Sequence, residues 1–470
     1  MTRDWFITGA TAKIKRSIVI KFLLVITALF ISTSLRPVML VLLPVFLVSL
    51  AYLLNLHLTR NILYLLLIIF LAGFIGIVYT NELNMANHLT SLYLILPLIL
   101  LMFSRVKTND TFHNNSYFEF FIGTLTVIFI FNNVYGIIQF IQIGNDDSFI
   151  GFYGRHGLNI HTLSLANYLL CSFYFFRYKQ QKNSVDLYLC VFFMISAIMG
   201  FFGLGLIVFL FAVFLYNISW KRLFQTIFIF AFVLSILASL LYLIKEETFN
   251  YNRSNLEAFY EAFTDKENFE YDQEKYHPVN LQTPRKLILH YNYAKVYLND
   301  IVLFIFGSGP GTFNSRTSFL LNGDYSDISF IKNTFKHTNV SIAREHVFPL
   351  WNSRILSRPY MDGTRNEPFS AIVAILSEYG FFVFLIVVLL FRSRLKRIFK
   401  SFDNLLNERN DLNYYYFYKR YLKFVIIFMT LNLFCDNYLE YPEFILLIVL
   451  VIKLIEMKVN SLKQQITPDT

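Results

Sequence analysis

Long apolar runs separated by short polar connections are the dominant pattern of this chain. Runs of about 20 residues match the length of helix that crosses a hydrocarbon layer of about 30 Å. Their apolar residues are continuous instead of alternating, and inside lipid only helices or closed barrels satisfy every backbone hydrogen bond. We therefore expect an all-α polytopic membrane protein with about twelve spans, at 17–35, 37–55, 61–79, 87–104, 117–143, 160–176, 186–201, 203–219, 222–244, 369–391, 421–438 and 441–457.

The stretch 186–219 is open to two interpretations. Glycines inside an apolar helical pattern indicate a possible break, and this stretch contains Gly200, Gly203 and Gly205. It therefore forms either two short spans that turn at these glycines or one helix with a re-entrant piece.

Basic residues concentrate in alternate connections. If the N-terminus lies in the cytoplasm, the even-numbered connections lie there too, and they contain most of the arginines and lysines. The short connections on the other side contain only Arg36 and Arg155. This asymmetry follows the positive-inside rule and predicts that both termini are cytoplasmic. It also accounts for the formal net charge of +10 without a nucleic-acid partner.

Composition agrees with a membrane protein and offers no cofactor signal. The chain is 56% apolar and 15% charged, whereas soluble domains carry about 25% charged residues. The three cysteines, Cys171, Cys190 and Cys435, lie in or at the ends of apolar runs and lack the spacing of disulfide frameworks or metal ligands. No Walker loop, dinucleotide-binding glycine motif or His-Glu-x-x-His motif is present. We expect neither a cofactor nor a metal.

One segment, residues 245–368, interrupts the apolar pattern and predicts a large external loop between spans 9 and 10. The chain then divides into a bundle at 1–244, the loop domain at 245–368, and the last three spans with a cytoplasmic tail at 369–470. The loop begins acidic, with nine acidic and three basic residues up to Glu274, and continues basic, with eleven basic and six acidic residues. Apolar residues at helical spacing over 285–305 predict an amphipathic helix on the bilayer or on the bundle.

The first candidate site precedes the sixth span, in Gly151-Phe-Tyr-Gly-Arg-His-Gly157. Arg155 beside glycines can present its guanidinium fork to a phosphate oxygen while the backbone approaches closely. The alternative is a tight interfacial loop in which this arginine extends toward water.

The second candidate is Phe306-Gly-Ser-Gly-Pro-Gly-Thr-Phe313, which follows the expected amphipathic helix. Gly307, Gly309 and Gly311 suit a turn whose backbone N–H groups face an anion. The alternative is an ordinary glycine and proline turn that ends the helix.

The third candidate is a basic stretch with interleaved aromatic residues. Its members suit a diphosphate and the stacking of sugar rings, and the alternative is a solvated face opposite anionic lipid headgroups. The stretch contains Lys332, Lys336, His337, Arg344, His346, Arg354, Arg358 and Arg365, with Phe335, Phe348, Trp351 and Tyr360.

The fourth candidate opens the tenth span, where Glu367 and Pro368 are followed by Ser370 and Glu378. A charge buried among apolar residues requires a partner. A structural and a functional role for Glu378 are both open at this point.

These four pieces, in this order and on one side of the membrane, resemble the superfamily of Wzy-type O-antigen polymerases and O-antigen ligases, membrane glycosyltransferases of the GT-C type. The resemblance covers about 150–390 in motif and the whole chain in topology. Phe369 stands where the ligases place a histidine, which favours a polymerase. The matching positions are Arg155, Gly157, Asn159, Arg285, Gly307, Gly309, Gly311, Phe313, Pro368, Ser370, Glu378 and Gly380.

The resemblance implies glycosyl transfer between undecaprenyl-diphosphate-linked oligosaccharides at the outer leaflet of a bacterial cytoplasmic membrane, with a chain-length regulator as a possible protein partner. Cationic groups would stabilise the departing diphosphate, and a base would accept the proton of the attacking hydroxyl. Gly307, Gly309, Gly311 and Glu378 would form a substrate loop. The candidates for the diphosphate are Arg155, Arg285, Arg344, Arg354, Arg358 and Arg365, and those for the base are Glu367, His346 and His337.

Two alternatives stay open: a ligase of the same superfamily, and a flippase or other transporter of lipid-linked oligosaccharides. Coupled transporters usually hold ionisable residues at membrane depth. Here such residues are scarce in the middle of the spans and cluster at the outer surface. This distribution and the large loop favour an enzyme.

Overall fold

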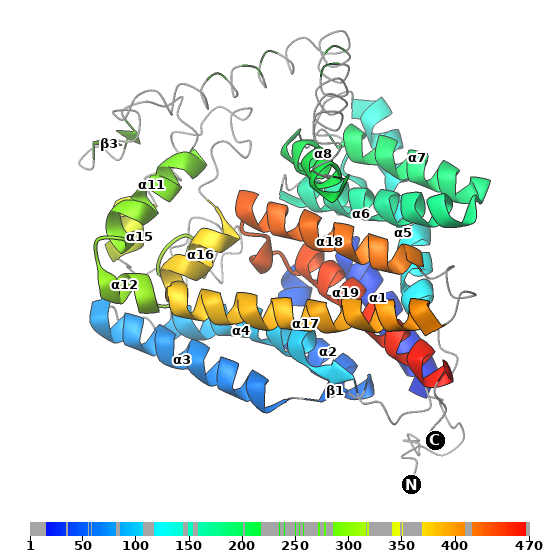
Figure 1. The fold of residues 1–470 in the computed structure, drawn as a ribbon. Coiled ribbons are helices and arrows are strands. Elements are labelled where there is room, and N and C mark those ends of the chain that lie inside the picture. Colours follow the sequence, from blue (N-terminus) through cyan, green and yellow to red (C-terminus); the bar gives the residue numbers. More distant parts are fainter. Residues whose placement is uncertain are drawn as a thin grey trace, which may run out of the picture.

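The structure is a computed structural model of the 470-residue chain. Most of the described residues are helical (Figure 1), which confirms the all-α class for this part of the chain. The structure describes residues 16–33, 36–54, 56–57, 59–80, 85–106, 117–143, 149–153, 158–200, 203–217, 235, 239, 250, 253, 257, 271–272, 277–278, 285–315, 317–318, 341–347, 350, 369–408 and 416–466.

The helices follow the apolar runs closely. The bundle helices are α1 (Arg16–Ile31), α2 (Arg36–Leu53), α3 (Arg60–Thr80), α4 (Met85–Phe103), α5 (Tyr117–Ile143), α6 (Leu158–Gln181), α7 (Ser184–Met199), α8 (Gly203–Asn217), α16 (Ala371–Glu378), α17 (Gly380–Glu408), α18 (Tyr416–Cys435) and α19 (Pro442–Ile466). The predicted loop contributes α11 (Arg285–Tyr297), α12 (Ile301–Phe306) and α15 (Ser341–His346). Short 3-10 helices are η2 (Gly151–Tyr153) and η7 (Tyr438–Glu440).

Two small antiparallel ladders complete the described secondary structure. Strand β1 (Leu56–His57) pairs with β2 (Arg105–Val106), and β3 (Tyr271–Asp272) pairs with β4 (His277–Pro278). The first ladder joins the end of α2 to the end of α4, so these two helix ends lie side by side.

The structure decides one open alternative and differs from the sequence prediction at two places. The stretch 186–219 forms two helices, α7 and α8, that separate at Gly200, which confirms the first of the two interpretations. The tenth predicted span is broken between α16 and α17, because Gly380 has a positive φ of 80°. The single helix expected over 285–305 is wrong: Asp300 accepts hydrogen bonds from the backbone N–H groups of Val302 and Leu303 and starts a second helix. The predicted span 222–244 lies outside the described residues.

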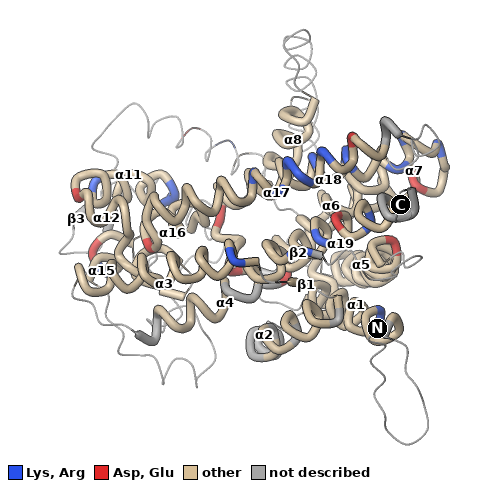
Figure 2. Tube along the Cα trace, turned by 60° about the horizontal axis from the view of Figure 1, so that its bottom comes forward, with Lys and Arg blue, Asp and Glu red and all other residues tan. Residues whose placement is uncertain are grey.

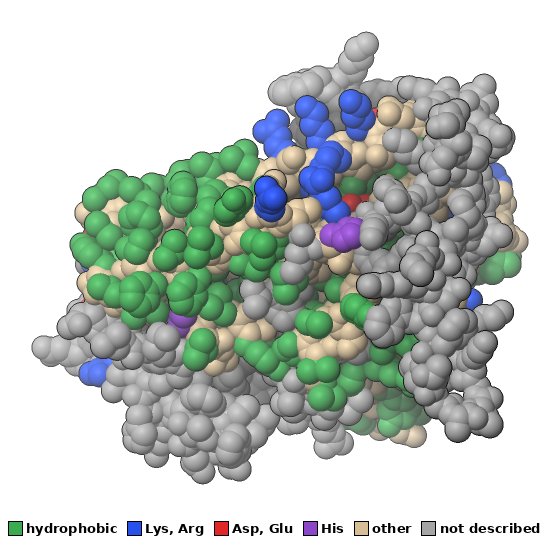
Figure 3. Space-filling view, turned by 90° about the horizontal axis from the view of Figure 1, so that it is seen from below, with side chains coloured by type: hydrophobic (Ala, Val, Ile, Leu, Met, Phe, Trp, Pro, Cys, Tyr) green, Lys and Arg blue, Asp and Glu red, His purple; other side chains and the backbone are tan. Residues whose placement is uncertain are grey.

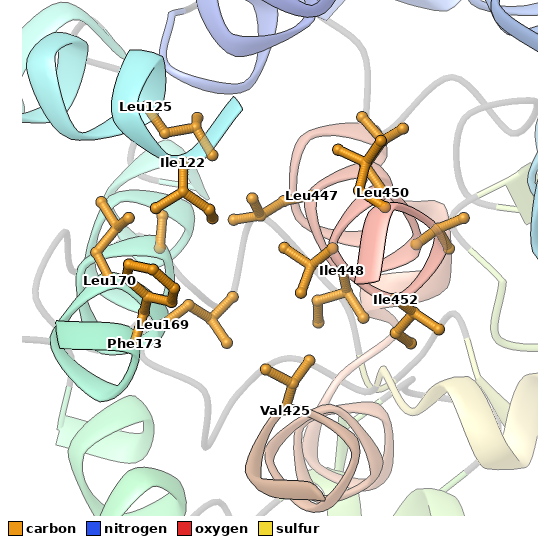
Figure 4. Packing of buried hydrophobic residues seen from close by; sticks show 14 of the residues in the cluster. Ile122, Leu125, Leu169, Leu170, Phe173, Val425, Leu447, Ile448, Leu450 and Ile452 are labelled. Atoms are coloured by element: carbon orange, nitrogen blue, oxygen red, sulfur yellow. The ribbon is translucent and has the colours of Figure 1, made fainter. Parts of the chain in front are cut away.

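Helix α19 forms the centre of the bundle. Every residue from 443 to 455 is buried, as expected for a helix that is apolar on all sides. Figure 4 shows Leu447 and Ile448 of α19 pointing toward Ile122 of α5, with α6 and α18 closing the cluster. The central position of α19 explains how segments distant in sequence share one core.

A pair of amides joins α5 to α6 inside this core. Asn133 Nδ2 donates to Asn167 Oδ1 at 2.8 Å, and Asn167 Nδ2 donates to Asn133 Oδ1 at 3.0 Å. Both side chains are fully buried. Because each amide satisfies the other, the two polar side chains fit together where either alone would be costly.

Replacing Asn133 by leucine is therefore expected to destabilise the fold by about 1–3 kcal/mol, because Asn167 would lose its buried partner. Thermal unfolding in detergent is the measurement. The double variant Asn133→Leu/Asn167→Leu should recover part of the loss, since no amide is then left unpaired. A double variant that is less stable than the sum of the two single variants would contradict this explanation.

Helix ends alternate between two faces of the bundle. Near the start of α5, Glu119 lies 3.1 Å from Lys458 late in α19, and Lys21 of α1 lies over the ring of Phe120. At the opposite end, Tyr79 at the end of α3 donates to Asp300. Figure 1 shows α11, α12 and α15 grouped at this second end, which we call the loop end. Most of the described Lys and Arg residues lie toward the first end, which we call the basic end (Figure 2).

In the part of the chain that the structure describes, two helices, α3 and α5, are long and apolar enough to cross a membrane. Less than half of each apolar stretch is buried, at 39% for α3 and 44% for α5, so neither resembles the enclosed core helix of a soluble protein. Large apolar side chains such as Phe131 and Ile141 are 64% and 75% exposed. Figure 3 shows hydrophobic side chains covering a broad face beside a band of Lys and Arg. A hydrophobic surface of this extent marks contact with another apolar phase or partner.

Candidate functional site

The described loop elements share a small core of their own with the bundle. Helices α11 and α12, the end of α15 and the start of α16 meet at the loop end (Figure 1). The buried residues of this second core are Ile288, Leu289, Tyr297, Leu303, Phe313, Val347, Leu350, Phe369 and Val373. The loop elements therefore pack directly against the bundle. Two residues of the apolar pattern that predicted the amphipathic helix, Leu298 and Ile301, are 60% and 68% exposed, so this part of the pattern does not face the bundle.

The glycine turn, residues 307–315, hydrogen-bonds to the end of α16. The backbone N–H of Ser308 donates to the carbonyl of Ser377 at 2.8 Å, and that of Gly309 donates to the carbonyl of Glu378 at 3.0 Å. Gly307 has a φ of 77°, and a Cβ there would lie 2.5 Å from the backbone carbon of Glu378. Only glycine permits both this conformation and this approach.

The side chain of Glu378 completes this contact. Its oxygens accept hydrogen bonds from the backbone N–H groups of Gly311 at 2.6 Å, Phe313 at 3.1 Å and Ser315 at 3.0 Å. Glu378 is 1% exposed. The turn thus forms a nest of backbone N–H donors of the kind that the sequence indicates, and the acceptor in it is a carboxyl side chain of the same protein. The partner that Glu378 requires is the glycine turn.

Helix α3 supports the turn from the other side. A Cβ at Gly76 would lie 2.6 Å from the backbone of both Gly307 and Gly309, and one at Gly73 would lie 2.8 Å from the ring of Pro310. The two α3 glycines therefore allow a close approach that larger residues would prevent. The glycine turn is held between α3 and the α16–α17 break.

Two basic residues open α11 at this boundary. Arg285, the first residue of α11, is 4% exposed. Lys286 Nζ donates to the carbonyl oxygen of Phe369 at 3.1 Å and to that of Cys435, the last residue of α18. A cation at the carbonyl end of a helix is favourable, because those carbonyls lack intrahelical partners. Lys286 therefore anchors α11 while Arg285 enters the buried boundary.

The turn between α18 and α19 adds polar residues that the sequence analysis did not select. Glu440 accepts a hydrogen bond from Thr317 Oγ1 at 2.9 Å and another from Asn437 Nδ2 at 2.6 Å. Asp436 is fully buried and its carbonyl accepts from the backbone of Ala371. The signal available in the sequence is the acidic and amide residues Asp436, Asn437 and Glu440 between two apolar runs.

An apolar cavity of about 280 Å³ adjoins this polar cluster. It lies between α3, α4, α16, α17, α18 and α19, and Ile375, Tyr379 and Leu439 also border a small space beside Glu378 and Glu440. The cavity is therefore a hydrophobic chamber with one end at the loop site.

His346 ends α15, beside α11. Its backbone carbonyl accepts a hydrogen bond from Asn292 Nδ2 at 2.7 Å, and its side chain is 18% exposed. Burial lowers the pKa of His346, with Glu345 opposing and Lys295 adding to the shift. Burial and the neighbouring Lys286 also lower the pKa of His290. Both imidazoles are held neutral, the form that accepts a proton.

These lowered pKa values predict that stability falls in acid. The folded state binds fewer protons than the unfolded chain, whose histidines titrate near about 6.5, so stability is complete above that pH and is lost as the pH falls below it. The unfolding temperature should therefore decrease between about pH 7 and pH 5. The variant His346→Gln should show a weaker decrease, whereas His57→Gln, at an exposed position, should behave as the wild type. Equal pH profiles for all three proteins would contradict the assignment.

The structure brings together only part of the predicted site. Arg285, the glycine turn, Glu378 and His346 gather at the loop end, whereas Arg344 is exposed on α15. Arg155 lies outside the described residues, although η2 just before it is anchored by Asn132 Oδ1, which accepts from the backbone of Phe152 at 2.6 Å. His337, Arg354, Arg358, Arg365 and Glu367 also lie outside the described residues.

Comparison with models of protein families, with curated proteins and with solved structures finds no match for this chain. Among the described residues, no group of three His, Cys, Asp or Glu side chains is arranged to hold a metal ion.

Proposed function

We propose that this chain is an integral membrane protein of twelve helical spans, with its basic end and both termini in the cytoplasm and its loop end outside. The exposed apolar surfaces of α3 and α5 support this placement. The alternating helix directions support it too, because successive apolar helices run between the basic end and the loop end. A charge distribution of this kind orients helices in a bacterial inner membrane.

Within that setting we propose a Wzy-type polymerase, a glycosyltransferase that joins undecaprenyl-diphosphate-linked repeat units of a surface polysaccharide. One observation carries this proposal: motif residues from two separate stretches form one buried contact, and a third lies buried at the same end of the bundle. Gly311 and Phe313 of the glycine turn donate to Glu378, and Arg285 at the start of α11 is 4% exposed. Motifs that form one unit are better explained by a shared task than by chance resemblance.

The proposed chemistry needs no group beyond the chain itself. A sugar hydroxyl of the acceptor attacks the anomeric carbon of the donor, the bond from that carbon to the diphosphate oxygen breaks, and a base takes the hydroxyl proton. Arg285, with Arg155, would stabilise the negative charge on the departing diphosphate. His346 is the described candidate for the base, because burial lowers its pKa and keeps the imidazole in the neutral form that can accept a proton. The glycine turn, whose amides already bind Glu378, would hold the site together without binding the diphosphate.

The test is elongation by the purified protein. Given lipid-linked repeat units, the wild type should produce a ladder of longer lipid-linked glycans on gels, and Arg155→Ala and Arg285→Gln should each reduce the rate by about a hundredfold or more, as loss of a charge-stabilising donor does. Arg60→Gln, at an exposed position at the start of α3, is the control for loss of one positive charge and should retain most of the rate.

Two outcomes would redirect the assignment. If the wild type leaves the repeat units unextended but moves them across vesicles, the protein is a transporter. If it extends no repeat unit but transfers the glycan to a lipid A core acceptor, it is a ligase of the same superfamily.

A further inference from the structure

The apolar cavity ends, toward the basic end of the bundle, at a buried charged cluster. Side chains three or four residues apart share one face of a helix. On α17, Val387 and Phe391 line the cavity and Arg394 follows on the same face; on α19, Val449 is followed in the same way by Lys453. The two helix faces that line the cavity therefore each carry a basic residue, Arg394 or Lys453, just beyond the cavity.

This cluster is held by a shared carbonyl and one carboxylate. Arg394 Nη1 donates to the carbonyl of Ser104 at 3.1 Å, and Lys453 Nζ donates to the same oxygen. Glu456 pairs with both cations, at 3.1 Å from Lys453 and with a second bond to Arg394. Arg394 is 3% exposed and Lys453 is 1% exposed.

The cluster carries more positive than negative charge. Among the described residues, two buried cations face one carboxylate, and the exposed Arg397 and Arg105 lie close enough to oppose the charge on Arg394. Arg394 Nε is buried and has no hydrogen-bond partner among the residues that the structure describes. A buried charged donor without a partner is costly, so an additional anion would complete this cluster.

We propose that this is a binding site for an anionic phospholipid, with the phosphate at Arg394 and one acyl chain in the apolar cavity. The two ends of the cavity fix the orientation of the lipid, because Arg394 and Lys453 offer cationic donors at one end and the other end adjoins the carboxyl groups of Glu378 and Glu440, which offer a phosphate no cation. The site lies at the opposite end of the bundle from the proposed transfer reaction. It rests on the membrane placement proposed above and is independent of the activity.

Lipid binding to the purified protein tests the site. Native mass spectrometry with added phosphatidylglycerol or phosphatidylcholine of the same chains measures occupancy directly. The wild type should bind phosphatidylglycerol more tightly, and Arg394→Gln should weaken that binding by about tenfold or more, the effect of losing one charge-assisted hydrogen bond. Val387→Phe should also weaken it, because the larger ring fills the cavity that the chain would occupy.

Two matched substitutions serve as controls. Arg392→Gln removes an exposed arginine from the same helix, and Leu389→Phe enlarges an exposed residue there; both should leave binding unchanged. If Arg394→Gln does not fold, the preference of the wild type for phosphatidylglycerol over phosphatidylcholine and the effect of Val387→Phe decide the question. Equal affinity for the two lipids, competition by inorganic phosphate at similar concentration, or retention of a polyprenyl phosphate in place of phospholipid would each overturn the proposal.

Discussion

Replacing Glu378 by alanine should destabilise the protein by about 3–5 kcal/mol, because three buried backbone donors would lose their acceptor together. The donors are the N–H groups of Gly311, Phe313 and Ser315, and none can turn to water while the glycine turn remains docked. The loss is a large part of the stability of an ordinary fold, which is about 5–15 kcal/mol. Thermal unfolding in detergent and the yield of monodisperse protein are the measurements.

Two further variants separate the Glu378 contact from a general effect of charge. Glu378→Gln retains the shape but places an NH₂ group near the backbone donors, so its stability should lie between those of wild type and alanine. Glu345→Ala, at a side chain that is 64% exposed, should change stability by less than about 0.5 kcal/mol. Wild-type stability in Glu378→Ala would show that the turn does not depend on this side chain.

Replacing Gly380 by alanine should have the second large effect. Gly380 has a φ of 80°, a conformation that costs other residues about 1–2 kcal/mol. An added Cβ would also lie 2.2 Å from the carbonyl oxygen of Ile305, and backbone at that distance must move. We expect a loss of about 3 kcal/mol or more in unfolding free energy, with the loop elements separating from the bundle.

The control for Gly380→Ala is Gly123→Ala in α5. A Cβ at Gly123 would meet nothing within 4 Å, and alanine favours a helix over glycine by about 1 kcal/mol. This variant should be as stable as the wild type or slightly more stable. Limited proteolysis offers a second measurement, because a separated loop should be cut faster in Gly380→Ala than in Gly123→Ala. Equal cleavage of the two variants would contradict the proposed clash.

Hydropathy predicted the bundle helices well, because an apolar run of span length specifies a helix without knowledge of its neighbours. It predicted the break at Gly200 only as one of two alternatives, and it missed the break at Gly380. The latter depends on the close approach of Ile305, which no local pattern encodes. Asp300 interrupts the expected helix at 285–305 for a local reason, a helix cap, and that signal was available in the sequence.

The sequence predicted where the candidate site lies better than it predicted which residues contact each other there. The glycine spacing indicated an anion-facing turn, but it could not show that the acceptor is the carboxyl group of Glu378, 67 residues beyond Gly311 in the chain. Lys286 and Glu440 were not selected, because their roles depend on carbonyls and hydroxyls that only the folded chain brings near. Polar residues that fix a loop to a bundle carry no signature in sequence apart from their presence among apolar neighbours.

During synthesis, α11 and the segment that follows the glycine turn are made well before the residues that they contact. Lys286 binds the carbonyl of a residue 149 positions later, and Thr317 binds Glu440, 123 positions later. Chains emerge from the ribosome at about 5–20 residues per second, so the loop elements wait several seconds before α16, α18 and η7 exist to receive them. During that interval the turn and the face of α11 are exposed outside the bundle, where chaperones and proteases can reach them. The loop elements can therefore reach their final contacts only after the last quarter of the chain has been synthesised.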